Sequence, residues 1–384
     1  MFRRRFLSLA PQWAALAAAP AFIRSAHAQD GLSAKALSIG SSGALSGPLA
    51  GFGVDLKLGV EAAMGQINAR GGVNGRVLQF QMMDDGYVPQ RTVDNVKKMI
   101  SEGSVFALMS CVGTPNNAAI LPLIEESSLP YVAPMTGASS LRKPGMRNVF
   151  HVRASYTDEA RRLVQKLVGM GIKDLAIVQL DNGFGKEVLA DAVQALQAQG
   201  AKAVAQAALA TDGRNLSEVV SQITAARPGA VLLGTAGAAS VGLIAALKKA
   251  SPMLPVAGLS VTLTADGLKA LGAAGSGLAL TMVFPDPYRA KSPVVRDYQA
   301  AMRAIGQTEF SLGSLESYVN TRVLAEGLER AGRELTRAKL RTALAGLQKF
   351  DLGGFSVDYA AAAPFVGSKF VDLGVLGSAG RFLG

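Results

Sequence analysis

The sequence predicts an α/β protein built from two doubly wound lobes. Three observations predict it: short apolar runs alternate with amphipathic helical patterns, the loops between them are short, and the series is too long for one ordinary open sheet. Repeated strand–helix units with short connections form parallel sheets covered by helices on both faces. A chain of 384 residues that is 49% hydrophobic is also large enough for more than one domain.

The first half of the chain supplies the first series of strands and helices. Its expected strands are residues 36–39, 76–84, 105–110 and 131–133. Its expected helices are the pattern that ends near 69–72, followed by 89–101 and 117–127. Pro89 stands at the first position of its helix, where the missing N–H costs nothing.

A second series begins after a change in the pattern near Arg153. Its expected helices are residues 156–170, 184–199, 215–226 and 238–250. Its expected strands are residues 175–180, 203–208, 230–233, 256–259 and 278–283. The repetition of the same pattern indicates a second lobe of similar construction.

The last hundred residues break the alternation. Three helical patterns (293–305, 313–331 and 336–347) precede a β-rich tail (355–373). We therefore expect the chain to return to the first lobe and then to the second, through several crossing segments. The expected boundaries are 29–153 with 283–351 for the first lobe, and 154–282 with 352–384 for the second.

Residues 1–28 have the composition of an export signal. Three arginines (residues 3–5) precede an apolar, alanine-rich stretch, and Ala26-His27-Ala28 is a small-x-small cleavage site. The order Arg-Arg-x-Phe-Leu resembles a twin-arginine signal, although an ordinary Sec signal and a mitochondrial transit peptide also fit. We expect cleavage after Ala28 and a mature periplasmic chain that begins at Gln29.

Composition excludes several classes of function. Of the net charge of +11, four units belong to arginines of the first 28 residues, and the other basic residues are scattered without interleaved aromatics, so nucleic-acid binding is not predicted. The single cysteine, Cys111, excludes an intrachain disulfide and a cysteine zinc site. The only histidines are His27 and His151, so a polyhistidine metal site is excluded as well.

The glycine-rich loop at 40–53 does not have a nucleotide-binding pattern. No lysine follows its glycines, as a Walker A motif requires, and Gly51-Phe52-Gly53 is not followed by the third glycine of a dinucleotide fingerprint. Lys186 follows another glycine pair, but the next residue is Glu187 rather than Ser or Thr. We predict no cofactor.

Enzyme activity is not predicted. Asp84 and Asp85 are adjacent on a strand, so their side chains point to opposite faces. A serine hydrolase needs a histidine, only His151 survives processing, and no G-x-S-x-G elbow is present. A periplasmic hydrolase that uses Asp84, Asp85 or His151 is the first alternative, and a ligand-sensing regulatory domain is the second.

Binding of a small carboxylate fits the loops better. In open α/β sheets, ligands bind beyond the carboxyl ends of the strands, where loops lead into helices. The loops at these places are rich in Gly, Ser, Thr and Asn: 41–53, 111–117, 135–140, 181–184 and 235–240. Helix N-termini with free N–H groups suit a carboxylate.

Five stretches together carry a family resemblance. They are residues 43–53 (GALSGPLAGFG), 67–75 (INARGGVNG), Asp84-Asp85, 97–100 (KKMI) and 352–355 (LGGF). In this order they resemble the branched-chain amino-acid receptors of bacterial ABC importers, which are periplasmic binding proteins of type I. The resemblance implies two lobes joined by three hinge crossings, a small ligand trapped between them, and delivery to a membrane permease by hinge closure.

The resemblance also implies the ligand contacts. Phe52 would lie over the ligand, Thr114 would bind its carboxylate, and Phe184 would contact it from the second lobe. The further expected contacts are Tyr87, Thr136, Gly137, Ala138, Tyr156, Ala236 and Ser260.

Three positions depart from the family pattern. Ala236 stands where the amino-acid receptors have a tyrosine, and Ser260 stands where they have a glutamate that pairs with the ligand ammonium. An unpaired buried ammonium is costly, so the ligand is either an amino acid held in another way or an aliphatic or aromatic acid without an amine. The family disulfide is replaced by Cys111 and Tyr87, and we expect Tyr87 to reach towards the cleft.

Overall fold

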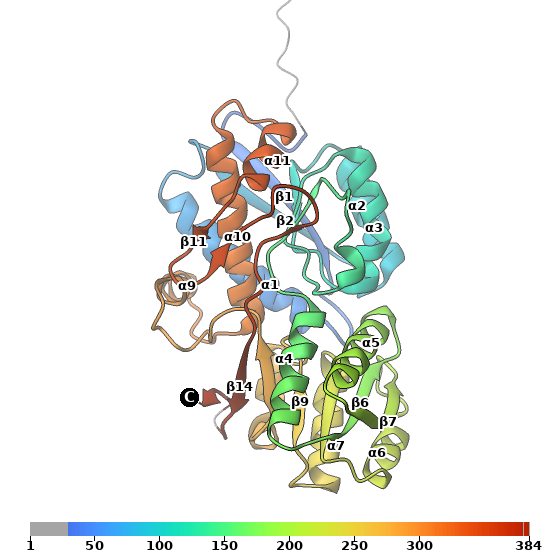
Figure 1. Cartoon of the computed structure of the whole chain (residues 1–384). Helices are drawn as coiled ribbons and strands as arrows, with labels where there is room; N and C mark the ends of the chain where they lie inside the picture. Colours follow the sequence, from blue (N-terminus) through green and yellow to red (C-terminus); the bar gives the residue numbers. More distant parts are fainter. Residues whose placement is uncertain (1–29, 379, 384) are drawn as a thin grey trace, which may run out of the picture.

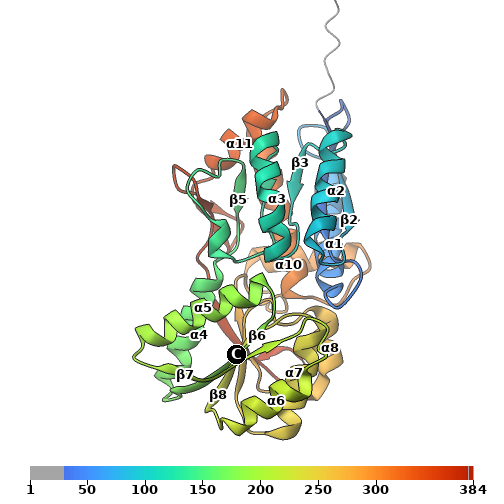
Figure 2. The same ribbon diagram turned by 90° about the vertical axis from the view of Figure 1, so that its right-hand side faces the viewer.

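Two α/β lobes are stacked one above the other, and each is a sheet with helices on both faces (Figures 1 and 2). The computed structural model describes residues 30–378 and 380–383. The export signal predicted at 1–28 lies outside the described residues. The predicted fold class, two doubly wound lobes, is confirmed.

The sheet of the first lobe is entirely parallel, with the order β13-β5-β4-β3-β1-β2 among the described residues. Its strands are β1 (Ala36–Gly43), β2 (Val77–Asp84), β3 (Ala107–Met109), β4 (Tyr131–Val132), β5 (Val149–His151) and β13 (Phe365–Val366). Its helices are α1 (Gly51–Ala69), α2 (Pro89–Ser101), α3 (Thr114–Ser127), α9 (Pro293–Ala304), α10 (Leu312–Ala331) and α11 (Arg337–Ala345), with a short 3-10 helix at Ser139–Leu141. A small hairpin of β11 (Phe350–Asp351) and β12 (Ser356–Val357) follows α11.

The sheet of the second lobe has the order β15-β14-β10-β9-β8-β6-β7, and β14 runs antiparallel to both of its neighbours, β10 and β15. Its strands are β6 (Asp174–Leu180), β7 (Lys202–Leu209), β8 (Ala230–Gly234), β9 (Val256–Gly258), β10 (Ala279–Met282), β14 (Asp372–Leu376) and β15 (Phe382–Leu383). Its helices are α4 (Tyr156–Gly169), α5 (Gly183–Ala198), α6 (Leu216–Ala225), α7 (Ala238–Ala250) and α8 (Ala265–Leu271), with a 3-10 helix at Gly272–Gly275.

The chain crosses between the sheets three times, after β5, after β10 and after β13. The first two crossings agree with the predicted boundaries at 153 and 283. The third does not, because β13 pairs with β5 of the first sheet and Phe355, Val357 and Phe365 pack into the core of the first lobe. Residues 352–367 therefore belong to the first lobe, and the predicted boundary at 352 is wrong.

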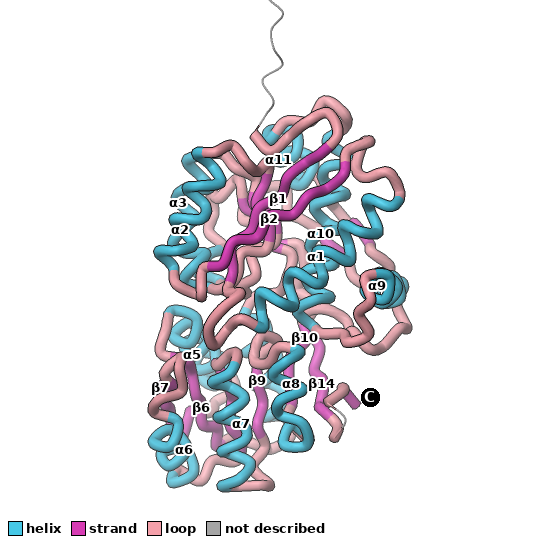
Figure 3. The backbone as a smooth tube through the Cα atoms, turned by 180° about the vertical axis from the view of Figure 1, so that it is seen from behind, coloured by secondary structure: helices cyan, strands magenta, loops and turns pink. Residues whose placement is uncertain are grey.

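The core of each sheet is divided between its two faces, as alternating strand side chains require. In the first lobe, α1, α9, α10 and α11 pack on one face and α2 and α3 on the other (Figure 3). A single apolar cluster joins α2 and α3 to α6 and α7 of the second lobe, through side chains that meet between the lobes. The two lobes thus share buried surface where a ligand is expected.

Local sequence explains most helix starts. Ser155 caps α4 in a capping box with Asp158, Asn182 caps α5 and Thr336 caps α11 through side-chain hydrogen bonds to backbone N–H groups. The predicted bounds are met within a few residues for most elements. Helix α3 begins earlier than the predicted residue 117, because Pro115 fits its first turn. Strand β5 and helix α8 were not among the predicted elements.

Candidate ligand-binding site

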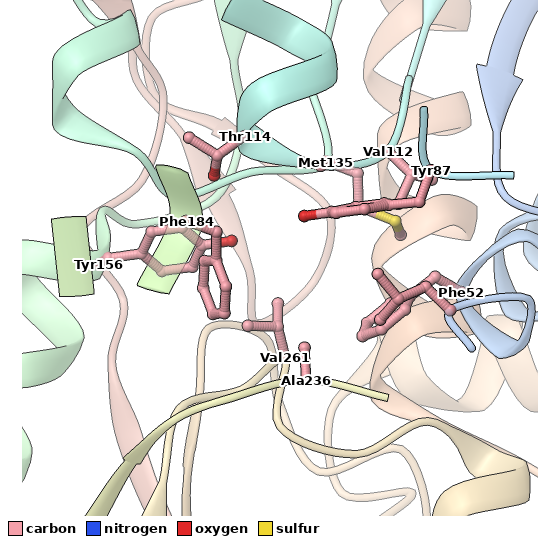
Figure 4. A pocket seen from close by; sticks show the side chains of 11 residues that line it. Phe52, Tyr87, Val112, Thr114, Met135, Tyr156, Phe184, Ala236 and Val261 are labelled. Atoms are coloured by element: carbon pink, nitrogen blue, oxygen red, sulfur yellow. The ribbon is translucent and has the colours of Figure 1, made fainter. Parts of the chain in front are cut away.

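A pocket lies between the lobes, at the carboxyl ends of the strands of both sheets (Figure 4). In chain order the parallel strands of each lobe lie 2-1-3-4-5, so the order reverses between β1 and β3 and between β6 and β8. Doubly wound sheets bind ligands at such switch points. The pocket is lined by Leu49, Phe52, Tyr87, Val112, Gly113, Thr114, Met135, Tyr156, Phe184, Ala236 and Val261.

The loop after β1 places Phe52 in the pocket. A Cβ on Gly53 would lie 2.1 Å from the carbonyl oxygen of Ala44, so only glycine allows the loop to fold back this closely onto α1. Phe52 then packs against both the first-lobe core and the cluster between the lobes. The glycines of this loop position an aromatic ring, which agrees with the absence of a phosphate motif.

The loop after β3 presents Thr114 at the start of α3. Gly113 has φ 97°, and a Cβ there would lie 2.4 Å from Cε2 of Tyr87, so glycine permits both the turn and the contact with the ring. The hydroxyl oxygens of Thr114 and Thr136 lie 2.8 Å apart. A helix N-terminus and a hydroxyl therefore meet at this end of the pocket, and both favour an anion.

The second lobe contributes an aromatic wall. The rings of Tyr156 and Phe184 meet edge to face, with their centroids 5.2 Å apart and an angle of 67° between them. Tyr156 begins α4, and Phe184 lies in the first turn of α5. Ala236 and Val261, from the loops after β8 and β9, complete the lower side in Figure 4.

The lining is uncharged. None of the side chains that line the pocket is a carboxylate, an amine, a guanidinium or an imidazole. Burial raises the pKa of Tyr87 and of Tyr156 above the usual range, so both hydroxyls stay protonated and can donate hydrogen bonds. The pocket thus offers neutral donors to a ligand and no carboxylate to a ligand ammonium.

A buried charge cluster lies beside the pocket, where the chain crosses between the lobes. The guanidinium of Arg153 donates to Glu159 Oε1 at 3.1 Å and to Glu316 Oε2 at 3.2 Å, and it also donates to the Ser260 hydroxyl. Glu159 Oε2 accepts from the backbone N–H of Ser260 at 2.8 Å and from the hydroxyl of Thr281. Burial alone would lower the pKa of Arg153, but the carboxylates of Glu316 and Glu159 outweigh it and raise the pKa.

Comparison with known proteins decides the family. The model of the periplasmic binding protein family matches residues 36–364. The chain belongs to this family. A Leu/Ile/Val-binding protein of Rhizobium johnstonii is 28% identical over 342 residues, which cover 86% of this chain and 87% of that protein. The family resemblance predicted from the sequence motifs is confirmed.

Solved structures of periplasmic binding proteins superpose on both lobes. A substrate-binding periplasmic protein from Ralstonia solanacearum has a TM-score of 0.85 and 30% identity, over 90% of this chain and 99% of that one. A solute-binding protein of an R. palustris ABC transporter, in complex with benzoate, has a TM-score of 0.82 over 91% and 95% of the two chains. The two sequences are only 19% identical, so this second comparison shows a shared fold and no more.

Six of the ten predicted contact residues line the pocket of this family member: Phe52, Tyr87, Thr114, Tyr156, Phe184 and Ala236. The other four lie behind that lining. Thr136 supports Thr114, the carbonyl of Gly137 accepts from the N–H of Tyr156 at 2.7 Å, and Ala138 is fully buried. Ser260 is bonded to Arg153 and lines a neighbouring cavity instead. These four residues are therefore absent from the lining of the pocket, and their contact with a ligand stays a prediction.

Sequence reasoning missed two kinds of residue. Leu49 and Val261 line the pocket, but single aliphatic residues in loops carry no signal of their own. Arg153, Glu159 and Glu316 form the cluster beside it. Arg153 and Glu159 are six residues apart at the predicted lobe crossing, and a charged pair at such a position could have been noticed.

The side chains considered for catalysis have structural contacts. Asp85 is buried and accepts from the hydroxyls of Ser42 and Thr92 and from the N–H of Tyr87, so it fixes the loop that carries Tyr87. His151 is buried in β5 away from the pocket lining, and burial lowers its pKa well below the usual range.

The described part of the chain has neither a metal-binding cluster nor a membrane-spanning helix. Within it, no three or more His, Cys, Asp and Glu side chains are grouped so that they could hold a metal ion. No helix in residues 30–378 and 380–383 is both long and apolar enough to cross a membrane.

The lobes touch each other around the pocket. The N–H of Ala238 donates to the carbonyl of Pro48 at 3.1 Å, and the N–H of Ala265 donates to the Asp55 carboxylate at 3.2 Å. On the other side, Ser140 donates through its N–H and its hydroxyl to Glu187, at 3.0 and 2.7 Å. These contacts hold the first lobe against the N-terminal ends of α7, α8 and α5, in a closed arrangement.

Proposed function

We propose that this protein is an extracytoplasmic receptor for a small carboxylate that lacks an α-ammonium group, and that it delivers this solute to an ABC importer. The observation that carries the proposal is the uncharged lining of the pocket. An α-amino acid would bury its ammonium group there without a carboxylate partner, which is costly. The carboxylates beside the pocket already accept hydrogen bonds: Glu159 and Glu316 from Arg153, and Asp55 from the N–H of Ala265.

The anion end of the ligand fits at Thr114. Its hydroxyl, the first turn of α3 and the neutral hydroxyls of Tyr87 and Tyr156 supply hydrogen bonds without a second charge. The carbon skeleton fits between Phe52 and Phe184, with Ala236 leaving room that a larger side chain would fill. Aliphatic and aromatic acids both match this description.

The benzoate-bound R. palustris protein supports the proposal, because the same fold holds an amine-free carboxylate there. The competing ligand class is a branched-chain amino acid, since the Rhizobium relative is named for leucine, isoleucine and valine. The two classes differ in one group, the α-ammonium, and the lining favours the class without it.

The mechanism is closure of the lobes on the ligand. A ligand that bonds to Thr114 in one lobe and packs on Phe184 in the other favours the closed state over the open one. The contacts Pro48–Ala238, Asp55–Ala265 and Ser140–Glu187 then form at the same time. The closed form is the one that a membrane permease would recognise, and no covalent chemistry is involved.

A thermal-shift screen tests the proposal. Protein that begins at Gln29 is unfolded and refolded to remove bound solutes, and it is then melted with leucine, isoleucine, valine, aliphatic acids or aromatic acids. A ligand at about 100 times its dissociation constant adds about 2.7 kcal/mol to the stability. Stabilisation by amine-free acids alone is the expected result. Stabilisation by amino acids alone would contradict the ligand class, and loss of added acid to a product would indicate an enzyme.

A further inference from the structure

A second cavity lies directly beside the ligand pocket. Its free volume is about 20 Å³, room for one water-sized group, and Phe52, Met135 and Val261 belong to the lining of both. Only these three side chains are shared, so they form the partition between the two spaces. Met135 is the most flexible side chain of this partition, because methionine has three rotatable bonds.

The second cavity has charged side chains in its lining, whereas the ligand pocket has none. Asp55, Arg153, Ser260 and Glu316 all contribute to its lining. Both terminal nitrogens of Arg153 donate to Glu159, Glu316 or Ser260, but its Nε is buried and has no hydrogen-bond partner among the described residues. An unbonded buried donor of this kind is costly, and a ligand group that accepts from it would remove the cost.

The two ends of the pocket determine which part of a ligand meets this cavity. Thr114 and Phe52 lie on opposite sides of the pocket in Figure 4. A ligand whose carboxylate is held at Thr114 therefore directs its far end towards Phe52 and Val261. Those residues adjoin the second cavity.

We propose that the second cavity is a specificity subsite for a neutral hydroxyl group at the end of the ligand opposite its carboxylate. The inference rests on the proposed function. A hydroxyl group can accept from Arg153 Nε and donate to the carboxylate of Asp55 or Glu316. It therefore satisfies both the donor and the acceptors of the lining. A second carboxylate would meet Asp55 and Glu316, and an ammonium group would meet the Arg153 guanidinium, so a neutral group fits best.

Calorimetric titration of ligand-free protein that begins at Gln29 tests the subsite. The probes are benzoate and 3-phenylpropanoate, each unsubstituted, with a 4-methyl group and with a 4-hydroxyl group. We expect the 4-hydroxyl acid of at least one series to bind about tenfold tighter than the 4-methyl acid, because a hydrogen bond to a charged group is involved. A 4-aminomethyl acid that binds tighter than the 4-hydroxyl acid would overturn the neutral-group assignment.

The same titrations separate the two claims. If the parent acids bind but the hydroxyl and methyl acids differ by less than twofold in both series, the subsite is wrong and the proposed function stands. If no carboxylate binds, the proposed function is wrong.

A variant that fills the second cavity tests whether the preference for the hydroxyl group arises there. Leu263 is buried and lines the second cavity but not the pocket. Leu263→Phe should abolish the preference for the hydroxyl group and retain binding of the parent acid. Leu335→Phe, which enlarges a buried leucine in the first-lobe core, is the matched control and should retain the preference. If Leu263→Phe does not fold, Leu312→Phe fills the same cavity, and the comparison of acids on the unaltered protein decides the claim alone.

Discussion

The guanidinium of Arg153 donates to the hydroxyl of Ser260, the residue that the family resemblance aligns with an ammonium-binding glutamate. Arg153 lies at the first crossing between the lobes, and Ser260 lies in the loop after β9. The serine hydroxyl therefore has a buried cation as its partner. Ser260 belongs to the charge cluster beside the pocket and lines the second cavity.

The cluster around Arg153 predicts a large effect on stability. Arg153→Met would leave the buried carboxylates of Glu159 and Glu316 without their cation, and the expected loss is roughly 3–5 kcal/mol in the free energy of unfolding. The loss should be smaller at pH 5 than at pH 8, because burial already raises the pKa of Glu316 and removal of the arginine raises it further. Urea unfolding at the two pH values measures it.

The control is the exposed pair of Arg161 and Asp158 on α4. Arg161→Met should cost less than about 1 kcal/mol, because solvent screens the pair. Equal losses for Arg153→Met and Arg161→Met would show that the buried cluster does not depend on its cation.

The hydroxyl of Thr114 is predicted to bind the ligand carboxylate. Thr114→Val keeps the shape and removes the hydroxyl, so the affinity for the bound acid should fall roughly tenfold or more. Thr224→Val removes the hydroxyl of a threonine on α6 that bonds only to its own helix, and it should leave the affinity unchanged. Calorimetric titration measures both variants. Unchanged affinity in Thr114→Val would place the carboxylate elsewhere in the pocket.

The small side chain of Ala236 is predicted to admit bulky acids. Ala236→Tyr fills part of the pocket, so binding of an aromatic acid should weaken by more than tenfold, and a short aliphatic acid should lose less. Ala198→Tyr, at the exposed end of α5, adds the same ring away from the pocket and should change neither affinity. A parallel loss of both acids in Ala236→Tyr would indicate general disruption instead of selection by size.

The buried carboxyl of Asp55 predicts a pH dependence of stability. Burial raises its pKa to about 7, although hydrogen bonds from Ala265 and Ser311 act in the opposite direction. A carboxyl whose pKa is raised on folding stabilises the fold most below its unfolded pKa near 4, and this stability is lost as the pH rises through 7. From pH 5 to pH 8 the loss is about 3 kcal/mol.

Asp55→Asn removes this ionisation, so its stability relative to the unaltered protein should increase from pH 5 to pH 8. Asp84 is the control: its hydrogen bond from Ser46 lowers its pKa, and it is ionised throughout this range in the folded and unfolded chains. The stability of Asp84→Asn relative to the unaltered protein should therefore not change with pH. If the difference in stability between Asp55→Asn and the unaltered protein did not change with pH, the Asp55 carboxyl would not be shielded from water.

Much of the fold was predictable because it depends on local patterns. The strand–helix alternation, Pro89 at the first turn of α2 and the capping serine before α4 all act within a few residues. The third crossing was not predictable in this way. Its position depends on the pairing of Phe365 with Phe150, which are far apart in the sequence and meet only in the folded sheet.

The residues of the site also fall into two groups, those placed by local sequence and those that depend on distant contacts. Phe52, Thr114 and Phe184 were predicted near one another because they follow strand ends, which converge in parallel sheets, and all three line the pocket. Thr136 and Ser260 lie in loops beside the pocket, but their hydroxyls bond to other side chains and they are not part of its lining. Which way a loop side chain points depends on partners such as Arg153 that belong to other segments of the chain.

The most direct test of the account is calorimetric titration of ligand-free protein with two pairs of solutes that differ mainly by the α-ammonium group. The pairs are leucine with 4-methylpentanoate, and phenylalanine with 3-phenylpropanoate. We predict that in each pair the amine-free acid binds at least tenfold tighter, because the uncharged pocket offers no partner to an ammonium group. Tighter binding of leucine than of 4-methylpentanoate would contradict the account and would require a carboxylate to turn into the pocket when the ligand binds.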